Sequence, residues 1–237
     1  MVTIDSRPYL RLPLASIEAR RCVYQAIESH ATLSHWPAHR AIYGVGDEVR
    51  AVYAVASGLL KTCGCTPDGH SYGAAPVFPG EPIALAEACT GITHFISAVT
   101  LTPATIWTLD VRRFSQLLDD VTFERAVLKL LAGRLLQFTN QTENFSVLSA
   151  SARLAQLILR SAVEMGRPEG GHVVVEPFPT QEDIADLVGV TRPFATRLLG
   201  ELEGEGLVEI RRKHLRVLDI PRLQEVGQLE RRVPARR

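Results

Sequence analysis

Residues 178–219 read FPTQEDIADLVGVTRPFATRLLGELEGEGLVEIRRKHLRVLD, and this stretch decides how the C-terminal part of the chain folds. Thr180, with Asp183 three residues later, is a helix-start signal, and Gly189 permits the left-handed turn that ends the helix. A second helix follows from Thr191, which we expect to cap it. Two helices joined by so tight a turn are typical of a helix-turn-helix.

The apolar residues of this stretch recur at helical spacing and predict the buried face of each helix. The expected buried residues are Ile184, Ala185, Leu187 and Val188 in the first helix and Phe194, Ala195, Leu198, Leu199 and Leu202 in the second. That pattern leaves Arg192, Thr196 and Arg197 facing outward. An arginine near the N-terminus of a helix in the DNA major groove pairs bidentately with guanine, so we predict that Arg197 reads a guanine.

Residues 207–210 and 215–218 alternate like two short strands. They are joined by Arg211, Arg212, Lys213 and His214, which predicts a basic hairpin wing near DNA phosphates. A small helical domain with a solvated basic turn is the alternative, which the wing and its spacing disfavour. The candidate DNA-contacting residues are Thr180, Gln181, Thr191, Arg192, Thr196, Arg197, Arg211, Arg212 and Lys213.

The segment SASARLAQLILRSAVEMG at 149–166, followed by PTQEDIADLVGVTRPFATRLLGELEGEGLVEI at 179–210, carries a family resemblance. It resembles the C-terminal half of the cyclic AMP receptor protein / fumarate and nitrate reduction regulator (CRP/FNR) family of bacterial transcription regulators. Further upstream, YAVASGLLK at 53–61 is similar to a strand pair of the family's effector-binding β-roll. Pro79-Gly80-Glu81 is similar to the turn before its phosphate-binding cassette. The resemblance therefore extends over most of the chain.

Turn residues divide the region from about 33 to 118 into short apolar pieces, which predicts an antiparallel barrel or jelly roll. A cupin-like metalloenzyme has such strands too, so this alternative stays open. At 237 residues the chain is long enough for two domains. We expect an α+β protein with a cyclic-nucleotide-binding-like β-roll (jelly roll) over 1–118, a long dimerisation helix over 119–147 and a winged helix-turn-helix over 148–237.

Residues 121–145 read as one long helix whose apolar residues recur in steps of three and four, as in a coiled-coil seam. The expected dimer contacts are Leu128, Leu131, Leu135, Phe138 and Phe145. A single helix packed on its own domain shows the same stripe. A two-fold DNA reader needs a two-fold axis, so we expect a homodimer on a palindromic double-stranded operator, with RNA polymerase as a further partner.

The resemblance also implies where an effector would bind. In cyclic-nucleotide-binding relatives a Gly-Glu-Leu holds the ribose hydroxyl, an Arg-Ser clamps the cyclic phosphate, and the long helix adds paired hydroxyls. By alignment these positions are Ala84, Leu85, Ala86, His94, Phe95, Phe138 and Thr139. An anionic phosphate would lose its guanidinium partner there. We therefore expect an apolar pocket that takes a more hydrophobic effector than cyclic AMP, or one filled by its own side chains.

Cysteines and histidines keep redox, metal and haem sensing open as alternatives. The iron–sulfur members of the family use clustered N-terminal cysteines, whereas only Cys22 is N-terminal here. Cys63 and Cys65 would share one side of a strand, and Cys89 is isolated. A haem-binding relative uses a histidine of the roll, for which His30, His35, His39, His70 and His94 are available. None of these residues is assigned as a metal ligand.

The formal net charge is zero, so a DNA-facing charge depends on how the basic residues cluster. The sequence contains no Gly-x-Ser-x-Gly, no phosphate-cradling glycine-rich loop and no His-Glu-x-x-His, so an enzyme is the poorer hypothesis and no catalytic residue is assigned. No stretch approaches the roughly 20 apolar residues that span a bilayer, and no secretion signal is evident. These features predict a cytoplasmic protein without a membrane partner.

Overall fold

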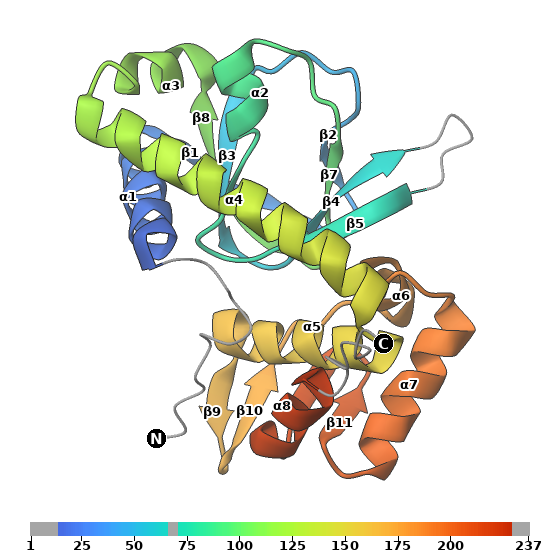
Figure 1. The fold of residues 1–237 in the computed structure, drawn as a ribbon. Helices are drawn as coiled ribbons and strands as arrows, with labels where there is room; N and C mark the ends of the chain where they lie inside the picture. The colour runs from blue at the N-terminus through green and yellow to red at the C-terminus, as the bar shows by residue number, and fades with distance from the viewer. Residues whose placement is uncertain (1–13, 66–70, 229–237) are drawn as a thin grey trace, which may run out of the picture. The chain divides into compact units, whose positions relative to one another are not determined.

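The computed structural model describes residues 14–65 and 71–228; of residues 14–16, 65, 71, 72, 137–147 and 228 it describes the backbone alone. The described residues fall into two compact units, one ending at Leu136 and the other running from Gln137. The long helix α4 (Val121–Val147) crosses this boundary, so it contributes to both units (Figure 1). None of the described helices is long and apolar enough to cross a membrane.

The N-terminal unit is a roll of two four-stranded antiparallel sheets, with the orders β1-β8-β3-β6 and β2-β7-β4-β5. The strands are β1 (Thr32–Trp36), β2 (Ala41–Tyr43), β3 (Ala51–Ser57), β4 (Leu60–Cys65), β5 (Ser71–Val77), β6 (Pro82–Ile83), β7 (Ser97–Thr100) and β8 (Ala104–Asp110). Three helices accompany them, namely α1 (Leu14–His30), α2 (Leu85–Thr90) and α3 (Val111–Leu117). The roll confirms the fold predicted from the short apolar segments.

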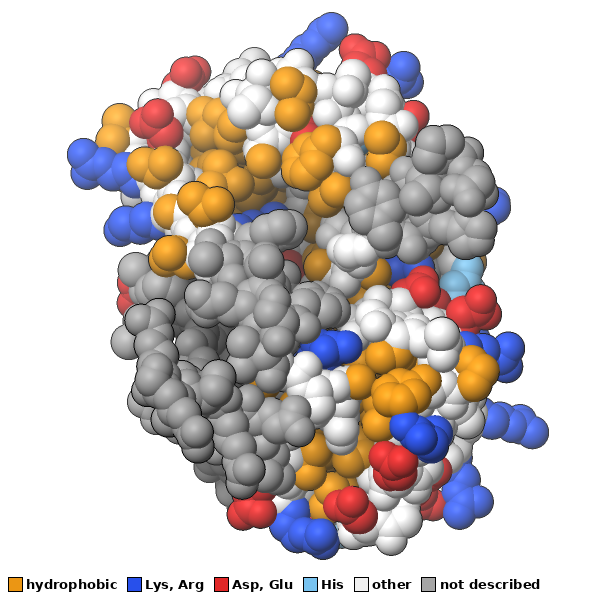
Figure 2. Space-filling view, turned by 45° about the vertical axis from the view of Figure 1, so that its right-hand side comes forward, with side chains coloured by type: hydrophobic (Ala, Val, Ile, Leu, Met, Phe, Trp, Pro, Cys, Tyr) orange, Lys and Arg blue, Asp and Glu red, His pale blue; other side chains and the backbone are white. Residues whose placement is uncertain are grey.

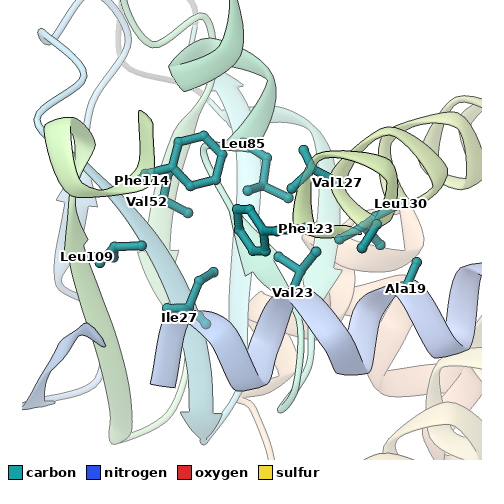
Figure 3. Close-up of a cluster of buried hydrophobic side chains, with 12 residues drawn as sticks. Ala19, Val23, Ile27, Val52, Leu85, Leu109, Phe114, Phe123, Val127 and Leu130 are labelled. Carbon is teal, nitrogen blue, oxygen red and sulfur yellow. The ribbon is translucent and has the colours of Figure 1, made fainter. Parts of the chain in front are cut away.

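One face of α4 belongs to the core of this unit. Figure 3 shows side chains of α1 and α4 meeting those of the roll in one buried cluster. In it, the rings of Phe114 and Phe123 contact edge to face, with their centroids 5.9 Å apart. Some apolar residues of α4 are therefore part of the core of the N-terminal unit, and only the others can take part in a contact on the opposite side of the helix.

The turn between β3 and β4 explains why the 53–61 segment contains a glycine. Gly58 has a φ of 86°, and a Cβ atom at this position would lie 2.4 Å from the carbonyl oxygen of Pro103. Any side chain would thus clash with the backbone as well as strain it. This glycine lets the β3–β4 turn lie against the backbone of Pro103 and Ala104, where β8 begins.

The C-terminal unit is a winged helix-turn-helix, as expected. Its helices are α5 (Ala150–Met165), α6 (Gln181–Val188), α7 (Arg192–Gly204) and α8 (Ile220–Gln228). The strands β9 (Arg167–Glu169), β10 (His172–Val175), β11 (Val208–Arg211) and β12 (His214–Val217) form a sheet of order β11-β12-β10-β9. The buried faces of α6 and α7 close the core of this unit.

Two local expectations were wrong. Thr191 occupies the N-cap position of α7 but its side chain makes no capping hydrogen bond. Pro193 lies at the second helical position and lacks one of the N–H groups that such a cap needs. The wing turn is also shorter than expected, because Arg211 and His214 pair with each other at the ends of β11 and β12. Only Arg212 and Lys213 remain in the turn.

Candidate functional site

Thr180 begins α6 with a reciprocal cap. Its hydroxyl oxygen accepts a hydrogen bond from the Asp183 backbone N–H over 3.2 Å, and the Asp183 carboxylate accepts from the Thr180 N–H over 3.0 Å. The hydroxyl also donates to that carboxylate, over 2.6 Å. The cap fixes the start of the helix and leaves Gln181 exposed at its first position.

Gly189 ends α6 in the left-handed conformation, with a φ of 73°, and α7 follows after two more residues. The buried residues of α7 are Ala195, Leu198, Leu199 and Leu202. Arg192, Thr196 and Arg197 are exposed, as the helical spacing predicted. Phe194 is the exception to the prediction, because it is half-buried at the margin between the two faces.

A hydrogen bond joins the two helices at this surface. The Thr196 hydroxyl donates to Gln181 Oε1 over 2.8 Å, and the carbonyl oxygen of Arg192 lies 3.0 Å from the same hydroxyl. Residues that the sequence placed on two separate helices thus come together on one exposed surface.

Arg197 is held between two neighbours on α7. Its guanidinium carbon lies 4.5 Å from the centroid of the Phe194 ring, and its Nε lies 3.6 Å from Glu201 Oε1. The side chain is 63% exposed. Sequence reasoning missed both neighbours, although their spacings of three and four residues from Arg197 are the spacings of facing helical side chains.

Charges on the wing are partly neutralised within the sheet. Arg211 Nε lies 2.9 Å from Glu209 Oε1, and Arg216 lies between Glu209 at 3.6 Å and Glu169 at 3.4 Å. Arg212 and Lys213 are exposed at the turn, and within the described residues neither has a recorded ion pair. Basic and acidic side chains are interspersed on the surface of this unit (Figure 2), so the turn supplies the wing's uncompensated positive charge.

The effector candidates divide between the interior and the surface of the roll. Ala84, Leu85 and His94 are buried and Ala86 is half-buried, whereas Phe95 is 57% exposed. The backbone of His94 is hydrogen-bonded to Asp47 and to Gly46, which orients its side chain inward and leaves Phe95 outside. Phe95 therefore lies at the surface of the single chain, and its place in an effector pocket stays a prediction. The side chains of Phe138 and Thr139 lie outside the described residues.

Inside the roll, two buried rings are stacked on each other. His94 lies on Tyr43 with ring centroids 3.7 Å apart and planes within 10°, and its Nδ1 lies 3.7 Å from Glu87 Oε1. Burial first, and then the Glu87 carboxylate, raise the pKa of Tyr43 far above its ordinary value, so the phenol stays protonated. The positive charge of Arg134 acts in the opposite direction and lowers the pKa of Tyr43 in part. The Arg134 side chain donates a hydrogen bond to the carbonyl oxygen of Pro82.

A cyclic nucleotide does not fit these residues. The position of the phosphate clamp carries an imidazole that is stacked on Tyr43 and next to a buried carboxylate. A second anion there would be desolvated beside Glu87 without the charge-assisted partner that repays this cost.

Thiols and imidazoles are dispersed through the described part of the roll. Cys22 is half-buried, Cys63 is buried and Cys89 lies at the surface, all as free thiols, while the Cys65 side chain and His70 lie outside the described residues. Partial burial raises the pKa of the Cys89 thiol, which disfavours the thiolate that binds metals and reacts with oxidants. His30 and His35 contact Ala26 and Thr105, and His39 is exposed. Among the described residues, no three His, Cys, Asp or Glu side chains converge as a metal site.

One apolar stripe of α4 remains uncovered in the single chain. Val121 is 56% exposed, Leu128 67% and Leu135 70%, and these residues recur every seven positions. Leu131 is half-buried against the core of its own unit, so it is a poorer dimer contact than expected. The side chains of Phe138 and Phe145 lie outside the described residues. Sequence reasoning missed Val121, the first member of this stripe.

Comparisons with known proteins match both units. The cyclic nucleotide-binding domain model matches residues 33–121, and the Crp-like helix-turn-helix domain model matches residues 152–226. The "CRP-like cAMP-activated global transcriptional regulator" of Mycobacterium tuberculosis is 24% identical over 87% of this chain and 96% of its own length. The "Global nitrogen regulator" of Synechococcus elongatus is also 24% identical, over 76% of this chain and 82% of its own.

Solved structures show the same fold. A CRP-family transcriptional regulator of Thermus thermophilus has a TM-score of 0.69 at 23% identity, with 82% of this chain and 96% of that one covered. FixK2 of Bradyrhizobium japonicum has a TM-score of 0.69 at 21% identity, covering 83% and 96%. With a cyclic nucleotide-binding domain followed by a Crp-like helix-turn-helix, and with such regulators as its relatives, the chain belongs to the CRP/FNR family of transcription regulators.

Proposed function

We propose that the protein is a homodimer that binds a palindromic double-stranded DNA operator, and that a signal other than cyclic AMP, sensed in the β-roll, switches its affinity. The exposed face of α7 carries the proposal, because Arg192, Thr196 and Arg197 lie opposite a buried apolar face. Such a helix docks its polar face in the major groove while its apolar face stays on the domain.

Each candidate residue has a role in this proposal. Arg197 reads a guanine, and the wing residues Arg211, Arg212 and Lys213 lie beside phosphates. The other contacts come from Thr180, Gln181, Thr191, Arg192 and Thr196. Gln181 and Thr196 act together, since a hydrogen bond already joins them.

Dimerisation through α4 supplies the two-fold axis. In a parallel pair of helices, Val121, Leu128 and Leu135 of one copy would meet the same residues of the other and remove their apolar surface from water. Two α7 helices could then enter successive major grooves, and the bound dimer would be positioned to act on RNA polymerase.

Switching requires that the signal bind two states of the dimer unequally. Helix α4 is the element through which the roll can act on the DNA-binding unit, because it begins in one compact unit and ends in the other. A shift of paired helices at a subunit interface is an established kind of allosteric transition.

Two alanine variants test the assignment of the DNA surface. Arg197→Ala should cost about 1 to 3 kcal/mol on the operator and relax the preference at one base pair. Arg212→Ala should weaken binding to all sequences alike and reduce the salt dependence of binding. Fluorescence anisotropy with operator variants at several salt concentrations measures both effects. An Arg197→Ala protein with its base preference intact would make Arg197 a phosphate contact and contradict the orientation of α7.

A further inference from the structure

Arg197 is restrained on two sides before any DNA is present. The Phe194 ring lies under the guanidinium at 4.5 Å, and Glu201 Oε1 lies 3.6 Å from Nε. Within the described residues, no hydrogen bond or ion pair is recorded for the two terminal nitrogens of this side chain. These are the nitrogens that can donate together to O6 and N7 of guanine.

Helix stability does not account for this arrangement. An exposed ion pair contributes little, and an i, i+4 pair in which the acid follows the base is the weaker order in a helix. Glu201 is 54% exposed and Arg197 is 63% exposed, so solvent screens their attraction. The effect of the two neighbours therefore falls on the conformation of Arg197.

A restrained arginine is a better reader than a flexible one. Arginine has many rotamers, and a side chain already held in its binding conformation loses less freedom when it binds. The flat face of Phe194 supports the guanidinium plane, as in other contacts between arginine and aromatic rings. Glu201 adds a negative charge beside the guanidinium, which repels phosphates and opposes non-specific contacts by Arg197.

We infer that Phe194 and Glu201 are positioning residues for Arg197 and set its preference for guanine over the other bases. Phe194 acts on the affinity for the correct base, and Glu201 acts by weakening binding to DNA that lacks the operator. The inference rests on the proposed role of α7 in reading DNA.

The test compares binding to the operator, to the same operator with adenine in place of the guanine read by Arg197, and to unrelated duplex DNA. Phe194→Leu should reduce the guanine preference about two- to fivefold, the range expected for one cation–π contact, whereas Phe194→Tyr keeps the ring and should preserve it. Glu201→Gln should tighten binding to unrelated DNA and so reduce the specificity ratio. The matched control is Glu225→Gln, which removes one exposed carboxylate from α8 and should leave the ratio unchanged.

Arg197→Ala distinguishes the reading role of Arg197 from the positioning role of its two neighbours. If this variant loses the guanine preference while Phe194→Leu keeps that preference and Glu201→Gln keeps the specificity ratio, the positioning role is wrong and the reading role stands. If Arg197→Ala itself keeps the preference, both are wrong. Thermal unfolding of each variant identifies loss of fold, and should Phe194→Leu unfold, Glu201→Gln still tests the positioning role through the specificity ratio.

Discussion

His94 stands where the family resemblance places a strong cation, and its buried imidazole makes a ring stack but, among the described residues, no hydrogen bond through Nδ1. In the roll it is stacked on Tyr43, with Glu87 nearby, so the position that would hold a phosphate is filled by the protein's own groups. Ala84 and Leu85 similarly replace the polar group that would hold a ribose, and both are buried. At this scale, we expect three substitutions to change what the roll can recognise.

Cyclic AMP and cyclic GMP should therefore bind no better than other small anions, with dissociation constants in the millimolar range or weaker, since a charge-assisted pair is missing. Isothermal calorimetry measures this directly, with the cAMP-activated relative from Mycobacterium tuberculosis as the positive control. A micromolar dissociation constant for either nucleotide would contradict the fit argued for His94 and Glu87.

Sequence reasoning identified single residues best where local chemistry decides their role. Thr180 and Gly189 act through the backbone of their own turn, so their types and spacing sufficed. Phe194 was expected to be buried but is half-buried, because it lies at the margin between the two faces of α7 and periodicity alone does not set that margin. His94 was found by alignment, but its stacking on Tyr43 joins segments that are far apart in the chain.

Among the elements, α4 has two apolar sides with different roles. Phe123 and Leu130 point into the core of the N-terminal unit, while Val121, Leu128 and Leu135 are exposed at heptad spacing. The sequence predicted one stripe and combined the two sets, because both follow steps of three and four residues. Only the packing of α4 into the core of the N-terminal unit separates them.

Leu128→Glu should convert the dimer into a folded monomer, because it places two like charges against each other in an apolar seam and leaves the core intact. Lys129→Glu is the control, since it changes the charge of the next, exposed residue outside the stripe. Sedimentation velocity measures the assembly and circular dichroism the fold. An unchanged dimer with Leu128→Glu would remove this stripe from the subunit interface.

Gly58 in the β3–β4 turn has a matched control in Gly46. Both glycines have φ near 90°, but a Cβ at Gly46 meets no atom within 4 Å. Gly46→Ala should cost about 1 to 2 kcal/mol from the left-handed backbone alone. Gly58→Ala should cost about 1 to 3 kcal/mol more from the added clash. Urea unfolding of both variants measures the difference, and equal losses would mean that Gly58 is required for its φ only.

Elements without a clear period escaped the sequence reasoning. All three residues of β9 are exposed, so no apolar alternation marks this strand. Helix α8 begins at Ile220-Pro221 and is short, and α2 follows Ala84, whose left-handed conformation alanine rarely adopts. These elements form because α5, β10 and the roll provide surfaces for them, which is tertiary information.

For the whole molecule, the fold class and the order of its two units followed from the sequence because each unit has its own repeating signal: short strands broken by turns, then capped helices. The zero net charge gave no such signal, and we expect DNA recognition to depend on a few residues of α7 and the wing turn. In the proposed dimer that small surface is present twice, so we expect the operator to show the two-fold symmetry of the protein.

Genome-wide mapping of the DNA bound by the protein in its own cells tests this claim most directly. The account predicts bound regions that share a two-fold symmetric sequence, with half-site centres about 10 to 10.5 base pairs apart. Each half-site should contain a guanine, and the Arg197→Ala variant should no longer require that guanine for binding. Bound regions with no shared sequence, or with a shared sequence that lacks two-fold symmetry, would contradict it.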